Sequence, residues 1–255
     1  MKQFIFFLIL LFSDILLAKD ESIVKSIYTL LINDLSETQL SKYAEKISNP
    51  NDKISLKCLE TQEGQYYIGL AHSLTINSPA KEVASIIETF NQYPVVFEGI
   101  EDAKIMKKMD LENIIVEFEN KSPAFFIPNI RYQMEYKIIP THTGKIYKYH
   151  LSNLLPQKDI LFSDGVMFLE EKNGVTRFYE IDFFNANWGL AEKIAGSRIW
   201  HDSIKELVIS DFELKLKAEN LNMTVSEKKN KIKNLIDDDQ IEKCIQNKLS
   251  VKNFH

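Results

Sequence analysis

Apolar side chains, with one histidine among them, occupy every second position along residues 66–76. The set is Tyr66, Ile68, Leu70, His72, Leu74 and Ile76. A period of two is typical of a strand with one buried face. Ser78 is a favourable helix N-cap, and Pro79 is tolerated at the first helical position because an N–H there would have no partner. We therefore expect a strand that leads directly into a helix.

The helix that follows is short. Its apolar face consists of Val83, Ile86, Ile87 and Phe90 at helical spacing. The residue before a proline is disfavoured in helical backbone, so this helix is expected to end near Tyr93, just ahead of Pro94.

Segments rich in β-branched and aromatic residues come next, separated by turn signals. We expect strands at 103–109, 114–119, 130–138, 145–155, 160–170 and 175–186. Asn173-Gly174 between the last two is a hairpin signal. Successive strands without intervening helices indicate an antiparallel meander.

Helical patterns return after the meander. Residues 189–219 predict one long helix, whose apolar face includes Trp200, Ile204 and Phe212. Residues 223–249 predict a charged helical tail, in which Thr224 and Glu227 fit a capping box.

A strand, short helices, an antiparallel meander and a long helix form a distinctive order. Together with Asn-Ser-Pro-Ala at 77–80 and Tyr-Pro at 93–94, this order resembles the START-like domains of the SRPBCC superfamily over residues 65–219. The resemblance implies an α+β helix-grip fold, in which a curved antiparallel sheet wraps around a long C-terminal helix and an apolar cavity lies between them. We assign residues 61–220 to this domain. Residues 19–60 are expected to form an N-terminal helical extension, and residues 221–255 a C-terminal helical tail.

The first residues carry a different pattern. Lys2 precedes an apolar run at 4–12, and a second apolar stretch ends at Ala18. This pattern is typical of a secretory signal peptide at 1–18, and the run is shorter than the roughly 20 residues of a membrane span. An uncleaved membrane anchor is the alternative. We expect an exported protein, either periplasmic or secreted.

Export affects the interpretation of the two cysteines. In an exported protein, Cys58 and Cys244 would be in an oxidising compartment, where two cysteines often form a disulfide. We expect a disulfide between them, which typically stabilises by about 2–4 kcal/mol. Two separate buried thiols are the alternative.

Composition excludes several classes of function. The 255 residues carry a formal net charge of −5, whereas capture of nucleic acid needs a basic face. There are 8 glycines and no glycine-rich phosphate loop, and no HExxH, GxSxG or CxxC motif occurs. The five histidines are far apart in the sequence, so spacing gives no support for a metal site. We expect neither a metal nor a cofactor.

One histidine and one pair of acidic residues carry open alternatives. His201 is either a polar anchor or general base inside the cavity, or a residue on the flank of the long helix; helix geometry favours the flank. Glu180 and Asp182 lie either in the cavity, as an acid pair with raised pKa values, or outside it, paired with Lys or Arg. Buried unpaired carboxylates are costly, so the sequence favours the outer position.

START-like domains bind lipids, sterols, isoprenoids or polyketides, and some relatives are cyclases or dehydratases. By this resemblance we expect an exported protein that binds or transfers a lipid-like molecule, with transient membrane contact. The expected ligand-binding residues are Phe118, Tyr132, Met134, Tyr136, Trp188, Trp200 and His201. The alternatives are a cyclase or hydrolase that uses His201 or the Glu180/Asp182 pair, and a structural or interaction protein without a ligand.

Overall fold

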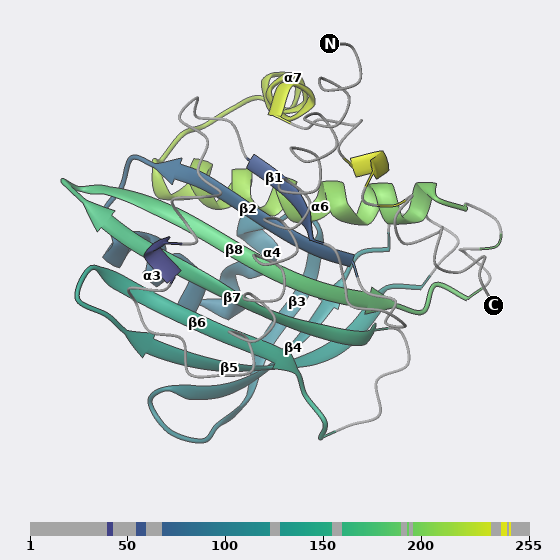
Figure 1. Ribbon diagram of the computed structural model, residues 1–255, viewed down its shortest axis with the longest axis horizontal. Helices are drawn as coiled ribbons and strands as arrows, with labels where there is room; N and C mark the ends of the chain where they lie inside the picture. Colours follow the sequence, from purple (N-terminus) through teal and green to yellow (C-terminus); the bar gives the residue numbers. More distant parts are fainter. Residues whose placement is uncertain are drawn as a thin grey trace, which may run out of the picture.

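A curved antiparallel sheet is the main element of the computed structural model, and the helix α6 lies alongside it (Figure 1). The structure describes residues 40–42, 55–59, 68–122, 128–154, 160–189, 193, 196–235, 241–243 and 245. Within these residues, eight strands form one sheet in the order β1-β2-β8-β7-β6-β5-β4-β3. The predicted meander corresponds to β3 through β8, and β2 pairs with β8 at the end of the sheet opposite to β3.

The strands follow the predicted segments with small shifts at their ends. They are β1 Ser55–Leu59, β2 Ile68–Ile76, β3 Ile100–Lys108, β4 Asn113–Asn120, β5 Ile130–Pro140, β6 Gly144–Leu151, β7 Ile160–Lys172 and β8 Val175–Ala186. The helices are α3 Ala80–Glu88, the 3₁₀ turn η1 Phe90–Gln92, α4 Tyr93–Val96, α6 Arg198–Ala218 and α7 Val225–Leu235.

Strand β1 lies within residues 19–60, for which the sequence predicted a helical extension. Within that range the structure describes residues 40–42 as helical but Ser55–Leu59 as a strand. It pairs antiparallel with β2, with Cys58 opposite Leu70. The free edge of β2 offers unpaired N–H and C=O groups, and β1 covers them.

The long helix begins later than its apolar pattern suggests. Gly196 has a φ of +59°, a left-handed conformation that glycine adopts without strain, and the turn it forms with Ser197 precedes Arg198. Ile204, Val208 and Phe212 are buried on the face of α6 that packs on the sheet and on α3. This stripe at intervals of four residues is what the sequence predicts.

Both faces of the sheet carry apolar clusters. The first cluster lies on the side of α3 and α6 and includes Leu70, Val116, Phe178 and Trp200. The second lies on the opposite face and joins the sheet to Leu40. It also contains Ala71, Ile146, Val166, Phe168, Tyr179, Ile181 and Phe183. Strand β8 is therefore buried on both sides.

The tail helix α7 begins with the predicted capping box. The backbone N–H of Thr224 donates to Glu227 at 2.8 Å, and the N–H of Glu227 donates to the Thr224 hydroxyl at 3.3 Å. Lys228 then ties α7 to the rest of the domain through ion pairs with Glu213 and, at 2.9 Å, with Glu98.

Two predictions fall outside the residues that the structure describes. They are the signal peptide at 1–18 and the Cys58–Cys244 bridge, for which Cys244 and the side chain of Cys58 are not described. Both stay predictions. None of the helices in the described ranges combines the length and the apolar character that a membrane crossing needs.

Candidate ligand-binding site

A cavity of about 290 Å³ lies between the sheet and α6. Most of its wall is aromatic or aliphatic and comes from β4, β5, β7, β8 and α6. Five of the seven predicted ligand-binding residues line it: Phe118, Tyr132, Met134, Tyr136 and Trp188. Four of them share the inner face of the sheet because each strand points alternate residues inward, and Trp188 follows the end of β8.

The other two predicted residues, Trp200 and His201, do not line this cavity. The cavity-facing positions of α6 include Ser203, Leu207 and Asp211. Trp200 is one turn earlier, is 1% exposed and packs edge-to-face on Trp188 at 5.9 Å, so it supports the wall from the core. His201 lies beside this stripe, with its Nδ1 3.7 Å from Asp202 Oδ1, on the flank of α6 rather than among the lining residues.

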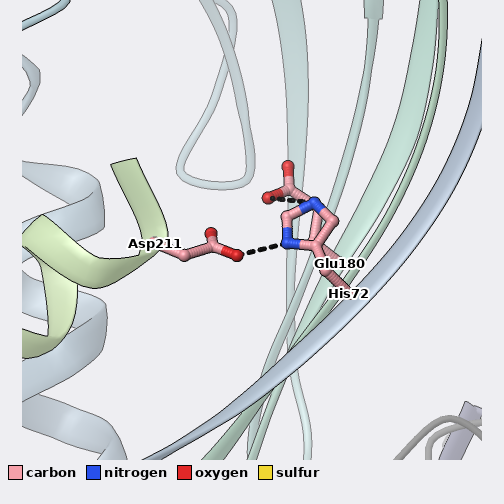
Figure 2. A group of neighbouring side chains, drawn as sticks. All are labelled: His72, Glu180 and Asp211. Atoms are coloured by element: carbon pink, nitrogen blue, oxygen red, sulfur yellow. Dashed lines mark hydrogen bonds and ion pairs between the residues drawn. The ribbon is translucent and has the colours of Figure 1, made fainter. Parts of the chain in front are cut away.

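The inner face also carries a polar cluster that the sequence analysis did not assemble. Figure 2 shows the His72 ring between the carboxylates of Glu180 and Asp211. His72 Nδ1 bonds to Asp211 Oδ2, and His72 Nε2 lies 3.5 Å from Glu180 Oε2. His72 and Glu180 are direct cross-strand partners in β2 and β8, whereas Asp211 comes from α6.

A tyrosine extends this cluster across the sheet. The Tyr149 hydroxyl donates to Glu180 Oε1 at 2.6 Å. Tyr149 lies opposite Gly165, and a Cβ at Gly165 would come within 2.3 Å of the Tyr149 ring. The missing side chain at Gly165 therefore makes room for the tyrosine.

The histidine is positively charged in this setting. Burial lowers the pKa of His72, but attraction and a hydrogen bond from Asp211, together with the charges of Glu180 and Asp182, outweigh it and raise the pKa to about 9. An imidazolium with both N–H groups aimed at carboxylates is therefore the form at neutral pH.

The carboxylates respond to the same burial. Burial raises the pKa of Glu180 and of Asp211, while the His72 charge pulls both down. Burial and then repulsion from Glu180 raise the pKa of Asp182 to about 8. Asp182 is 6% exposed and lines the cavity, and its Oδ1 has no hydrogen-bond partner among the described residues.

The favoured outer position of Glu180 and Asp182 is therefore wrong, and the alternative inner position is the one observed. Strand β8 has two faces, and Tyr179, Ile181 and Phe183 occupy the outer one, where they join the cluster around Leu40. Because neighbouring residues point to opposite faces, burying those three side chains outside forces the two carboxylates inward.

His72 and Asp211 were the residues that sequence reasoning missed. A signal for His72 was present, since it stands among Leu70, Leu74 and Ile76 on the buried face of its strand. The sequence signal for Asp211 is weaker, because it consists only of one acidic residue next to the apolar stripe of α6. No spacing rule links them, because they are 139 residues apart.

The same three side chains are a conceivable ligand set for a metal ion. One donor atom from each of His72, Glu180 and Asp211 lies within 4.8 Å of the others. His72 and Asp211 already bond directly, however, so an ion would have to separate them. The arrangement is that of a closed ion pair, and we assign no metal or cofactor to it.

Comparison with known proteins concerns the fold. No family model matches the chain, and no curated protein matches it. Among solved structures, a STAR-related lipid transfer protein from Xanthomonas axonopodis is similar at 13% identity and a TM-score of 0.51, covering 68% of this chain and 94% of that one. The human StarD13 lipid transfer and protein localization domain is similar at 12% identity and a TM-score of 0.52, covering 73% and 97%. The chain thus has the START-like helix-grip fold that the sequence predicts.

Proposed function

We propose that this protein binds and carries a hydrophobic small molecule, such as a lipid, in the cavity between the sheet and α6. The observation that carries the proposal is the cavity itself, about 290 Å³ with a mainly aromatic and aliphatic wall. Each methylene that enters such a wall contributes about 0.8 kcal/mol. The two similar structures are named as lipid transfer proteins, which supports the same class of ligand.

The polar groups in the wall would orient the ligand. Asp182 Oδ1 and Trp188 Nε1 are buried without hydrogen-bond partners among the described residues, and both residues line the cavity. A binding site of this kind is mostly apolar with a few polar groups that fix one end of the ligand.

Export completes the proposal. The apolar run at 4–12 supports a signal peptide, and a periplasmic or secreted carrier would exchange its ligand during transient contact with a membrane. A Cys58–Cys244 bridge would then stabilise the exported form.

An enzyme of the cyclase or hydrolase type is the second candidate, and one observation favours it. Asp182 is a buried acid with a raised pKa in a cavity, which is the property of a general acid. His72 is a poor base in this arrangement, because both of its nitrogens face carboxylates. The two candidates differ in outcome, since a carrier returns its ligand unchanged.

The test is native mass spectrometry and solvent extraction of the full chain purified from its own cell envelope. We expect one apolar molecule per chain, released unchanged. The Leu207→Trp variant should lose it by filling the cavity, whereas Leu161→Trp at an exposed position should retain it. Ligand-free protein, or equal occupancy in both variants, would contradict the proposal, and recovery of an altered molecule would favour the enzyme.

A further inference from the structure

The charges that line the cavity are unbalanced. Glu180, Asp182, Glu206 and Asp211 line its wall, and the buried His72 pairs with two of them, Glu180 and Asp211. Among the described lining residues, Lys121 is the one Lys or Arg, and its half-exposed side chain pairs with Glu101 at 3.7 Å. Acidic side chains therefore outnumber cationic ones among the described lining residues by four to one.

The buried cation beside this wall, His72, is already engaged. His72 Nδ1 bonds to Asp211, and His72 Nε2 faces Glu180 at 3.5 Å. The Tyr149 hydroxyl donates to Glu180 as well. These contacts satisfy Glu180 and Asp211, and they leave Asp182 Oδ1 without a hydrogen-bond partner among the described residues.

Asp182 has the position of a ligand contact. Asp182 is only 6% exposed and lines the cavity. Its Oδ1 has no hydrogen-bond partner among the described residues. A buried acceptor without a donor is destabilising, and native structures normally supply the donor. A ligand is a natural source for it here.

We propose that the cavity selects an apolar molecule that ends in a protonated amine, and that an ammonium N–H donates to Asp182 Oδ1. This inference rests on the proposed function and names its ligand class. An ammonium group supplies the missing donor, and its positive charge favours the ionised form of Asp182. An alcohol supplies the donor alone, and a carboxylate or phosphate would enter a cavity lined by four acidic residues, where the buried His72 is already engaged.

The protons balance without another reactant. Burial and the charge of Glu180 raise the pKa of Asp182 to about 8, so Asp182 is mainly protonated at neutral pH before the ligand enters. An alkylammonium is a weaker acid and keeps its proton, so Asp182 releases its own proton to the solvent on binding. The charged or titratable groups that interact electrostatically with Asp182 are His72, Tyr132, Tyr136, Tyr149, Asp164 and Glu180.

The test is calorimetric titration of the full chain with four probes of equal chain length: decylamine, decanol, decanoate and decyltrimethylammonium. We expect decylamine to bind at least about tenfold more tightly than decanol, and decanoate to bind most weakly. Decyltrimethylammonium has the charge but no N–H, so it should fall below decylamine. In buffers of different ionisation enthalpy, decylamine binding should release about one proton at neutral pH.

A matched pair of variants locates the effect. In Asp182→Asn the ratio of decylamine to decanol affinity should fall to about one and the proton release should disappear. Asp102→Asn, at an exposed position of β3, removes the same charge and should keep both. The melting temperature of each variant reports whether it is folded, and the wild-type proton release tests the inference even if Asp182→Asn is not.

The outcomes separate the two proposals. Equal affinity for decylamine and decanol overturns the amine inference and leaves the apolar carrier intact. Equal affinity for decylamine and decyltrimethylammonium also overturns it, because the N–H donor would then contribute nothing. The absence of proton release overturns it as well, because Asp182 would then not ionise on binding. Failure to bind any of the four probes overturns both proposals.

Discussion

The two faces of β8 are both buried, but they are buried in different ways. On the outer face, Tyr179, Ile181 and Phe183 are in an apolar cluster, in which Tyr179 stacks on Phe168 at 6.2 Å. On the inner face, Glu180 and Asp182 border a cavity of about 290 Å³. One strand thus supplies a closely packed side that stabilises the fold and an incompletely filled side that can accept a guest. The difference shows that the unfilled face, rather than the sheet as a whole, is where function is to be sought.

Truncation on the packed face should have the largest effect. Phe183 is 1% exposed in the outer cluster, so Phe183→Ala should lower the free energy of unfolding by about 3–5 kcal/mol through lost burial and a new void. Urea denaturation of the full chain measures this, with Leu161→Ala at an exposed position as the control. A loss below about 1 kcal/mol would mean that the outer face is not closely packed.

The ion pair on the inner face should show itself as pH dependence. The pKa of His72 is raised from 6.5 to about 9 in the folded protein, so its stabilisation is complete below about pH 6.5 and is lost as the pH rises through 9. This loss is on the order of 3 kcal/mol. His72→Gln should remove that part of the slope from unfolding curves recorded at successive pH values.

The matched control for the histidine is His150→Gln, because His150 has a half-exposed side chain on β6. It should retain the slope between pH 6.5 and 9. The same slope in His72→Gln and in the wild type would show that the buried pair does not stabilise the inner face.

Truncation next to the cavity should cost less than truncation on the packed face. Phe184 is 9% exposed, and its ring centroid lies 6.1 Å from that of Trp200. Because Phe184 also lines the cavity, one side of its ring already lacks close neighbours. We expect Phe184→Ala to lower the free energy of unfolding by about 2 kcal/mol. Denaturation beside Phe183→Ala measures the difference, and equal losses would erase the distinction between the two faces.

The sequence predicted the fold well where one face of an element is plainly apolar. The alternation through Leu70 and Leu74 placed β2, and the stripe through Ile204 and Phe212 placed α6. It was ambiguous for β8, where Phe178 and Phe184 lie on one face and Tyr179 and Phe183 on the other. Periodicity assigns a register only when the two faces differ in polarity.

The site was less accessible from the sequence for a different reason. Aromatic residues such as Tyr132 and Tyr136 were found because they alternate inward along one strand. The pairing of His72 with Asp211 depends on how α6 docks against β2, and no local pattern records that contact across 139 residues. Trp200 lies on the predicted face of α6 but outside the cavity lining, because helical periodicity predicts the face of a helix and not how far a cavity extends along it.

The most direct test of the carrier proposal uses the methionines as reporters. Met134 and Met167 line the cavity, while Met106 and Met109 are about half exposed. In the full chain labelled with ¹³C at the methionine methyl groups, added decanol should shift the Met134 and Met167 signals and leave those of Met106 and Met109 in place. Unchanged Met134 and Met167 signals at saturating decanol, or shifts confined to the exposed pair, would contradict the presence of an apolar guest between the sheet and α6.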